Sequence, residues 1–286
     1  MTVSVITLAS EARAEHVRRQ QEHLRSLPVD RVIVWLDAEP PRADDVLATA
    51  GARLVHVPPG EHGLRLAAGR NAGARAAADA SRAEAGAPEL LVFLDADCIP
   101  GPDLLARYRA AATARPDALL AGPVTYLPPG APVETPADLR RATAPHPARP
   151  VPADGELLDG DRYELFWSLS FAATRETWDS LGGFDEGYEG YGGEDTDFAF
   201  RAREAGVPLV WVGGAHAYHQ HHPTTNPPVQ HLGDILRNGR RFAERWGEWP
   251  MRGWLTAFAG LGLVEEDGDG YRRARPASAP DPASRI

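Results

Sequence analysis

Residues 90–97 read Leu-Leu-Val-Phe-Leu-Asp-Ala-Asp, an unbroken apolar run that ends in the carboxylates Asp95 and Asp97. An apolar run of this length without polar alternation is typical of a buried strand in a parallel sheet. Residues i and i+2 of an extended segment point to the same side, so both carboxylates can face one cation. A polar turn before Pro100 is the simpler interpretation of the same residues. The stretch predicts a central strand that carries two acidic side chains at its carboxyl end.

The same pattern, a short apolar run followed by a helical segment, recurs through the first half of the chain. The predicted strands are Thr2–Leu8, Arg31–Asp37, Arg53–Val57, Leu90–Asp95 and Leu119–Val124. The predicted helices, rich in Ala, Arg and Leu at helical spacing, are Glu11–Leu27, Pro41–Ala50, Gly69–Ala85 and Gly101–Ala114. This alternation predicts an α/β fold with a central, mostly parallel sheet flanked by helices. Ligands of such sheets bind beyond the carboxyl ends of the strands, where Asp37, Asp95 and Asp97 are expected.

The second half of the chain is less regular. Residues 127–160 are rich in Pro, Ala and Asp and predict a long loop, either a mobile cover over the site or a linker. Two strands are expected beyond it, at Tyr163–Ala172 and Pro208–Val212. Three helices are expected at Arg175–Leu181, Asp195–Ala205 and His231–Trp246. Residues 265–286 have the composition of a disordered tail.

Composition excludes several classes of function. The chain has 286 residues, of which 43% are hydrophobic, enough to bury a sizeable core. Acidic side chains outnumber basic ones by 40 to 30, which argues against binding nucleic acid by neutralising phosphates. All 30 basic side chains of the Lys/Arg class are arginines, so a lysine nucleophile is excluded. A single cysteine, Cys98, excludes an intrachain disulfide. With no signal peptide and no transmembrane segment in the pattern, we expect a cytoplasmic protein, which a lipid-linked acceptor could still bring to a membrane surface.

Residues 66–75 place glycines and small side chains at the start of a predicted helix. They read Leu-Ala-Ala-Gly-Arg-Asn-Ala-Gly-Ala-Arg. Small residues let backbone N–H groups at a helix N-terminus approach a diphosphate, and Arg70 can add a bidentate contact. An ordinary alanine-rich helix with glycine at its entry is the alternative.

Residues 182–197 combine glycines, aromatic rings and carboxylates directly ahead of a predicted helix. They read Gly-Gly-Phe-Asp-Glu-Gly-Tyr-Glu-Gly-Tyr-Gly-Gly-Glu-Asp-Thr-Asp. The rings of Tyr188 and Tyr191 offer flat apolar faces that suit a sugar, while Glu194 and Asp195 offer acceptors for hydroxyls and a general base. The alternative is that Asp195 or Thr196 only caps the helix. A position at a helix N-terminus should also lower the pKa of Asp195.

Residues 216–222 read His-Ala-Tyr-His-Gln-His-His and follow a predicted strand. His219 and His221 alternate, so they share a face in an extended segment. A neutral imidazole is a good ligand for Mn²⁺ or a similar ion. A solvated polar loop is the alternative, and a structural zinc site is disfavoured because the chain has only one cysteine.

Taken together in this order, the four motifs resemble the inverting family 2 glycosyltransferases, which have the GT-A fold. Within them, Gly182–Arg201 resembles the module of the β-1,4-galactosyltransferases whose hallmark is an aromatic-Gly-Gly-Glu-Asp run, here residues 191–195. The resemblance implies one GT-A domain over residues 1–264. Residues 1–126 would form a nucleotide-sugar-binding half and residues 161–264 an acceptor half. Residues 127–160 would be the long loop that connects them.

The resemblance also assigns roles to individual residues. It implies that the nucleotide sugar meets Asp37, Arg70, Asn71, Asp95 and Asp97. It implies that a Mn²⁺ or Mg²⁺ ion is held by Asp97 and a histidine, with His219 the first choice and His221 the second. It implies an acceptor site of Tyr191, Glu194, Asp195 and Trp167, in which Glu194 and Asp195 are catalytic and Asp195 is the general base. The chain departs from the family where Tyr191 replaces a tryptophan, and where residues 7–10 lack the usual base-binding signature.

The predicted activity is metal-dependent transfer of a hexose from a nucleotide-diphosphate sugar, with a UDP-sugar favoured, to an acceptor hydroxyl. The acceptor would be a sugar, a lipid-linked molecule or a small molecule, and the single base favours inversion by analogy with the family. A nucleotidyltransferase is an alternative, although residues 7–12 lack the glycine-rich basic loop that it needs. A nucleotide-sugar- or glycan-binding protein without turnover and a metal-dependent hydrolase are the others.

Overall fold

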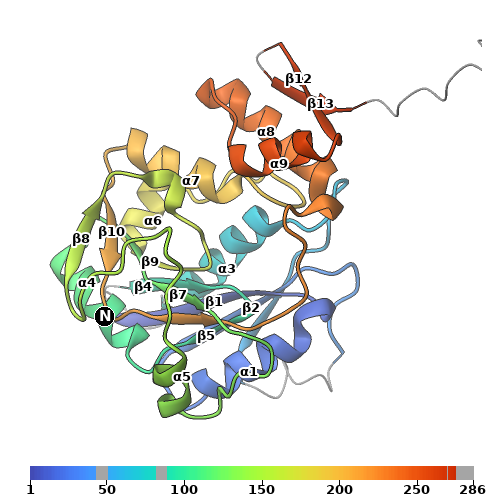
Figure 1. The fold of residues 1–286 in the computed structure, drawn as a ribbon. Coiled ribbons are helices and arrows are strands. Elements are labelled where there is room, and N and C mark those ends of the chain that lie inside the picture. The colour runs from blue at the N-terminus through green and yellow to red at the C-terminus, as the bar shows by residue number, and fades with distance from the viewer. Residues whose placement is uncertain (43–50, 82–88, 269, 275–286) are drawn as a thin grey trace, which may run out of the picture. The chain divides into compact units, whose positions relative to one another are not determined.

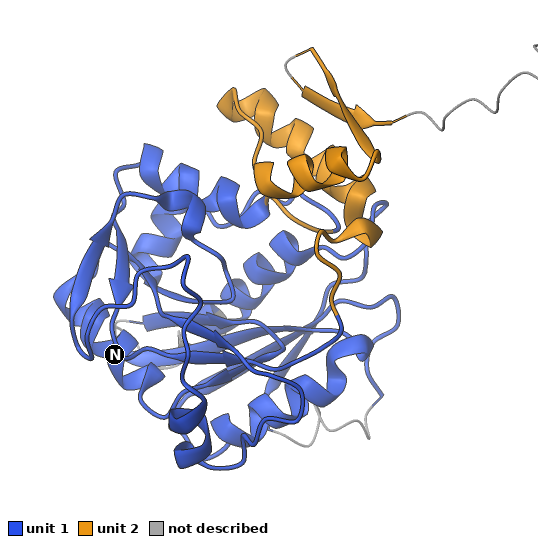
Figure 2. Ribbon diagram, in the orientation of Figure 1, with its two compact units in different colours: residues 1–190, 194–223 blue, residues 191–193, 224–286 orange. Residues whose placement is uncertain are grey.

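The computed structural model describes residues 1–42, 51–81, 89–268 and 270–274. The chain forms two compact units, which Figure 2 distinguishes by colour. Unit 1 comprises residues 1–190 and 194–223, and unit 2 comprises residues 191–193 and 224–286. The sequence predicted one domain over residues 1–264, whereas the chain crosses from unit 1 to unit 2 after Pro223.

Unit 1 is built around an eight-stranded mixed sheet (Figure 1). In spatial order its strands are β3 (Arg53–His56), β2 (Asp30–Trp35), β1 (Thr2–Ala9), β4 (Glu89–Leu94), β9 (Ser170–Thr174), β6 (Leu119–Ala121), β10 (Leu209–Val212) and β8 (Leu157–Gly160). The pairs β1–β2, β1–β4, β2–β3 and β6–β10 are parallel. Strand β9 runs antiparallel to both β4 and β6, and β8 runs antiparallel to β10. The predicted α/β fold with a mostly parallel sheet is confirmed.

Helices pack on both faces of this sheet, which explains why β4 is apolar without alternation. Leu91 and Phe93 belong to a buried cluster that includes side chains of α3 (Leu66–Ser81), α6 (Arg175–Leu181) and α7 (Glu194–Glu204). Leu90 and Val92 point the other way, into a cluster with α4 (Leu104–Ala114) and Leu24 of α1 (Ala14–Leu24). Successive residues of one strand therefore enter two different cores.

A small second sheet brings the late histidines to the end of β4. Strand β11 (Ala217–His219) lies between β5 (Cys98–Pro100) and β7 (Val124–Tyr126), antiparallel to the first and parallel to the second. The register places His219 opposite Cys98 on one side and Tyr126 on the other. Because Cys98 follows Asp97 directly, this pairing sets His219 beside the carboxylate that ends the acidic motif.

The irregular second half holds more structure than the sequence predicted. Residues 127–160 contain a helix, α5 (Pro136–Ala142), and the strand β8. Thr135 and Asp138 form a capping box at the start of α5, with Pro136 in the first turn, so a local helix signal was present. The predicted strand Tyr163–Ala172 begins as the short 3-10 helix η2 (Tyr163–Leu165) and becomes β9 only at Ser170.

The ends of other predicted elements also shift. The predicted strand Leu119–Val124 is divided into β6 and β7. Of the predicted helix Pro41–Ala50, residues 43–50 lie outside the described part of the chain. The predicted helix Arg175–Leu181 coincides with α6, which ends at Gly182 with a positive φ of 71°.

Unit 2 consists of η3 (Val229–His231), α8 (Leu232–Trp246), α9 (Arg252–Gly260) and a hairpin of β12 (Val264–Asp267) with β13 (Gly270–Arg273). Its core contains Leu232, Ile235, Trp249, Leu255, Phe258 and Val264. The prediction of a disordered tail from residue 265 is therefore wrong for the residues of the hairpin. Residues 275–286 lie outside the described part. No helix among the described residues combines the length and the hydropathy needed to cross a membrane.

Candidate active site

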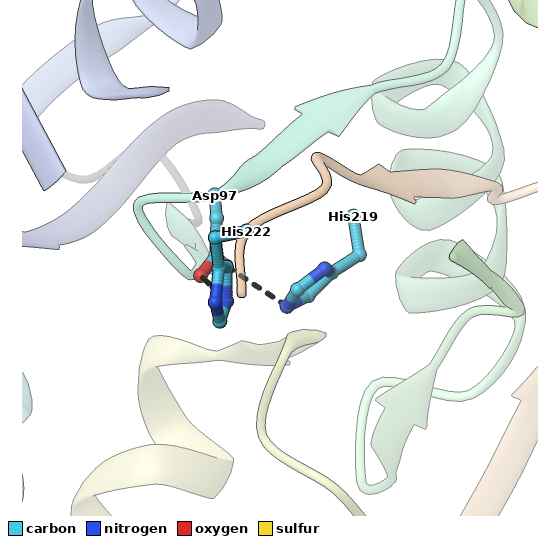
Figure 3. Close-up of side chains that lie close together, drawn as sticks. All are labelled: Asp97, His219 and His222. Atoms are coloured by element: carbon cyan, nitrogen blue, oxygen red, sulfur yellow. Dashed lines mark ion pairs between the residues drawn. The ribbon is translucent and has the colours of Figure 1, made fainter. Parts of the chain in front are cut away.

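Three side chains from two elements converge at the end of β4: Asp97, His219 and His222. Figure 3 shows both imidazole rings turned toward the carboxylate. Nε2 of His219 lies 3.5 Å from Oδ1 of Asp97, and Nε2 of His222 lies 3.2 Å from Oδ2. The side chains of all three are largely buried, so the group is a compact polar cluster at the carboxyl end of the sheet.

The donor atoms of this group fit one divalent cation. A carboxylate oxygen and two imidazole nitrogens lie within 4.8 Å of one another. Two ligands bound to one ion at about 2.1 Å lie about 3 to 3.5 Å apart, which matches the two distances from Asp97. One carboxylate with two imidazoles suits Mn²⁺ or Zn²⁺, whereas Mg²⁺ prefers oxygen ligands throughout.

The second imidazole of this group is His222, where the sequence predicted His221. The prediction assumed that the extended alternation continues past His219, but β11 ends there. The backbone N–H of Gln220 donates to the carbonyl of Asp97 at 2.7 Å, and the Gln220 side chain donates to the carbonyl of His16. Beyond β11 the His221 side chain is exposed, while His222 faces Asp97.

Arg13, which the sequence analysis did not single out, lies against the same group. Its Nε is 3.4 Å from Oδ2 of Asp97, and its Nη2 is 3.2 Å from Nδ1 of His222. Burial by itself would raise the pKa of Asp97, but the hydrogen bond from His222 and the charges of His219, His222 and Arg13 outweigh it and lower the pKa. Burial lowers the pKa of His219 in spite of the nearby carboxylate. Asp97 is therefore an anion and His219 a neutral imidazole at neutral pH, the forms that bind metal.

The other carboxylate of the acidic motif, Asp95, is directed to a different partner. Arg70 donates from Nη2 to Oδ1 of Asp95 at 3.2 Å and from Nη1 to Oε1 of Glu194 at 3.3 Å. Arg70 is only 3% exposed, so this arginine ties the end of β4 to the start of α7 from inside the protein. Burial raises the pKa of Asp95 to about 6, and the Arg70 charge offsets only part of this effect.

Asp195 follows Glu194 in the first turn of α7. Its Oδ1 accepts a hydrogen bond from the backbone N–H of Thr196 at 2.7 Å. Burial raises the pKa of Asp195 to about 7, and the negative charge of Glu194 adds to the rise. The expected lowering by the helix N-terminus is therefore wrong, because burial and a like charge outweigh it. A carboxyl group that ionises near neutral pH is suited to general-base chemistry.

Two residues predicted to meet the donor are engaged within the protein. The side-chain amide of Asn71 donates to the carbonyl of Phe184 at 2.9 Å and accepts from the Phe184 N–H at 2.8 Å. Asp37 accepts from the backbone N–H of Glu11 at 2.6 Å, which fastens the segment after β1 to the end of β2. Both residues thus shape the backbone around the site, and their contact with a nucleotide stays a prediction.

The glycines of residues 66–75 allow α3 to pack closely on the sheet. A Cβ on Gly73 would lie 2.4 Å from Cγ2 of Ile6, and one on Gly69 would lie 3.0 Å from Cδ2 of Leu8. These glycines are therefore required for helix–strand packing, which is the plainer of the two interpretations that the sequence allowed. Binding of a diphosphate at this helix stays a prediction.

Residues 160–223, which carry β9, α7 and both imidazoles of the site, match the family described as the N-terminal domain of galactosyltransferase. The fold resembles that of GalNAc-T7, solved with UDP, GalNAc and Mn²⁺, at a TM-score of 0.56 and 16% sequence identity, covering 86% of this chain and 48% of that chain. It also resembles residues 1–349 of TarS from S. aureus, at a TM-score of 0.53 and 13% identity, covering 85% of this chain and 65% of that chain. The chain therefore has the GT-A-type fold of these two proteins, and its residues 160–223 are similar to the galactosyltransferase family. No curated protein matches its sequence.

A row of aromatic and imidazole rings connects the candidate cation group with a buried arginine. His219 stacks on Tyr126 at 4.6 Å between ring centres, Tyr126 contacts His146 at 5.6 Å, and His146 contacts Trp167 at 5.0 Å. Arg149 lies over the ring of Trp167 at 5.5 Å. The sequence predicted only Trp167 and His219, because residues 127–160 show no periodicity from which the others could be placed.

Tyr191, which the sequence predicted to stack on the acceptor, belongs to unit 2. Its ring stacks on His231 at 4.3 Å with an interplanar angle of 13°, and it contacts Trp254 at 5.7 Å. Its backbone N–H donates to Asp234 at 3.2 Å. The residue is thus built into the core of unit 2, and its role toward an acceptor stays a prediction.

Proposed function

We propose that this chain transfers a hexose from a nucleotide-diphosphate sugar, preferably a UDP-sugar, to an acceptor hydroxyl with inversion and in a metal-dependent reaction. The observation that supports this most directly is the acidic motif at the end of β4. Its Asp97 lies against two imidazoles, and its Asp95 is linked through Arg70 to Glu194, the neighbour of Asp195. One strand end thus serves both a cation group and a carboxylate base, the two parts that sugar transfer requires.

Asp97, His219 and His222 would hold the cation, for which Mn²⁺ is our first choice and Mg²⁺ the second. A divalent ion bound there would neutralise the charge that develops on the leaving nucleoside diphosphate. The presence of Mn²⁺ with UDP in the GalNAc-T7 structure supports this choice. Arg13, which lies against the same carboxylate, supplies a positive charge suited to the same diphosphate.

Asp195 is the proposed general base, which takes the proton from the acceptor hydroxyl as that oxygen attacks the anomeric carbon. Its pKa of about 7 lets the carboxylate form exist at neutral pH while it still binds a proton well. Glu194 and Asp95 are ion-paired with Arg70, so Glu194 is suited to orient the acceptor and Asp95 to contact the donor. With one base and no second carboxylate assigned as nucleophile, a single displacement and inversion follow.

The acceptor-binding site of this reaction is proposed for a class of molecules and not for one compound. We assign it to Glu194, Asp195, Trp167 and Tyr191, of which Trp167 presents a partly exposed ring. An aromatic face beside hydroxyl acceptors suits a sugar ring, whether free, lipid-linked or part of a small molecule.

The test is a screen of nucleotide sugars with Mn²⁺ or Mg²⁺, with nucleoside diphosphate release and product formation both followed. The proposal expects release that depends on the metal and on an acceptor. Asp97→Ala should abolish metal-dependent donor binding, and Asp195→Asn should retain donor binding while transfer is lost. Asp117→Ala is a matched control, because Asp117 is exposed and pairs with Arg115 on the surface.

Other outcomes would identify the alternatives. Donor cleavage that needs no acceptor would indicate a hydrolase, and release of pyrophosphate from a nucleoside triphosphate would indicate a nucleotidyltransferase. Tight donor binding without any turnover would indicate a binding protein. Full transfer by Asp97→Ala in the presence of a chelator would contradict the metal-dependent mechanism.

A further inference from the structure

Arg149 is a buried guanidinium whose hydrogen-bonding groups have no partner. The residue is 4% exposed, and within the described part of the chain none of Nε, Nη1 and Nη2 forms a hydrogen bond. Its guanidinium instead lies over two aromatic rings, 4.8 Å from the centre of Trp211 and 5.5 Å from that of Trp167. The N–H groups at its edge therefore remain unused.

A comparison with Arg70 shows how unusual this is within the same protein. Arg70 is buried to the same degree, but two carboxylates accept hydrogen bonds from it. An arginine that is withdrawn from water and left without an anion is strongly unfavourable, and cation–π contacts return only part of the loss. Burial lowers the pKa of Arg149 to about 10, so the side chain still carries its charge at neutral pH. A buried charge that the protein leaves unmatched indicates that its partner arrives with a ligand.

The position of Arg149 places this ligand at the proposed reaction centre. Its neighbour Trp167 continues through His146 and Tyr126 to His219 of the cation group. The charge of Asp195, the proposed base, also acts on Arg149. Trp211 is fully buried, whereas Trp167 is partly exposed, so a turn of the Trp167 side chain is the direct route by which a ligand would reach the guanidinium.

We propose that Arg149 recognises a carboxylate on a sugar substrate, so that the donor or the acceptor is a uronic acid type of sugar and not a neutral hexose. The guanidinium lies over two rings that accept no hydrogen bond from it, so its planar N–H fork is left to match a planar carboxylate in a bidentate contact. The diphosphate of the donor is already assigned to the cation group. This inference rests on the proposed function and narrows its substrate class.

The experiment measures binding of charged and neutral probe pairs in two arms. In the donor arm, UDP-glucuronate is compared with UDP-glucose in the presence of Mn²⁺. In the acceptor arm, methyl glucuronide is compared with methyl glucoside in the presence of UDP and Mn²⁺. We expect that in one arm the carboxylate probe binds about tenfold or more tightly than its neutral counterpart, as a charge-assisted contact requires. The arm that shows the preference identifies which substrate carries the carboxylate.

Variants then test whether Arg149 is responsible. Arg149→Gln should reduce the preference to about onefold without loss of the neutral probe, and Arg149→Lys should restore part of it, because the charge returns without the fork. Arg140→Gln is the control, since Arg140 is exposed on α5 and pairs with Asp103. If Arg149→Gln does not fold, Arg149→Lys and the wild-type comparison carry the test.

Two results would overturn the inference. Equal binding of charged and neutral probes by the wild type would refute the recognition of a carboxylate and leave the proposed function intact. If the preference survives in Arg149→Gln, other residues recognise the carboxylate and Arg149 has a structural role. If Arg149→Gln does not fold, an undiminished preference in Arg149→Lys leads to the same conclusion. Failure to bind any UDP-sugar, neutral ones included, would refute the proposed function and this inference together.

Discussion

Replacing His222 by alanine should weaken Mn²⁺ binding by about 100-fold or more, whereas the same change at His221 should leave it within about twofold of wild type. The two residues are adjacent in sequence and chemically identical. They differ in placement: Nε2 of His222 lies 3.2 Å from Asp97, and the His221 side chain is exposed. The pair therefore tests the geometry of the site while composition and charge stay constant.

The magnitude follows from the number of ligands. The group offers three donor side chains, and His222→Ala leaves two. Loss of a residue that only orients a ligand weakens metal binding about 10- to 100-fold, so loss of a direct ligand should reach at least the upper value. A 100-fold change corresponds to about 2.8 kcal/mol of binding free energy. Arg13, which lies 3.2 Å from His222, would be free to approach Asp97 more closely and compete further with the ion.

Calorimetric titration of Mn²⁺ into each purified variant, without any nucleotide sugar, measures this affinity independently of catalysis. Circular dichroism melting shows whether both variants are folded. Equal affinities for His222→Ala and His221→Ala, or a larger loss at His221, would refute the assignment of His222 as a ligand.

Three further predictions concern the base, the buried ion pairs and the helix packing. The transfer rate of the wild type should rise with pH through about 7, because the raised pKa of Asp195 keeps this base protonated and inactive below that value. Asp195→Asn should lower kcat by about 10²- to 10⁴-fold at all pH values. Arg70→Gln should lower the free energy of unfolding in urea by about 3 to 5 kcal/mol, since two carboxylates lose their buried partner, while the exposed Arg75→Gln should have little effect. Gly73→Ala should lower the free energy of unfolding by about 1 to 3 kcal/mol in the same assay, because the new methyl group meets β1. Gly233→Ala, whose methyl group meets open space, should not lower it. Equal stabilities of these two variants would contradict the packing argument.

The pKa shift of Asp195 also predicts the sign of a stability change with pH. Its pKa is raised from 3.8 to about 7 in the folded protein, so the folded state binds more protons than the unfolded state between these values. Its contribution to stability is therefore present at low pH and is lost as the pH rises from about 4 to 7. Chemical unfolding of wild type and Asp195→Asn across this range checks the sign, because the variant should lack this component of the pH dependence.

The fold could be predicted largely because local patterns and topology rules agree. The unbroken apolar run of β4 requires cover on two faces, and the clusters around Leu91 and Val92 provide it. The rule that ligands gather at the carboxyl ends of parallel strands directed attention to Asp97, which the structure places beside His219 and His222. These inferences depend on short-range periodicity, which a single sequence contains.

The details of the site depend on long-range register and on burial, which a single sequence does not contain. The choice between His221 and His222 depends on the path of the backbone beyond the end of β11 at His219, which local alternation does not give. The direction of the Asp195 pKa shift is decided by the surrounding protein, which a helix-end argument omits. Arg149 gave no signal at all, since a buried arginine and a surface arginine look alike in sequence.

The acidic motif itself is used differently from its simplest interpretation, in which two carboxylates one residue apart share a cation. Asp97 faces the imidazoles, while Asp95 faces Arg70 and, through it, Glu194 beside the proposed base. Each negative charge makes the other carboxyl group harder to ionise, and the charge of Asp97 raises the pKa of Asp95. A cation bound by Asp97 would relieve this repulsion and favour ionised Asp95, which strengthens its ion pair with Arg70. Occupation of the cation group would thus strengthen the contact of the same arginine that pairs with Glu194 at the start of α7, and would couple cation binding to the placement of the proposed base.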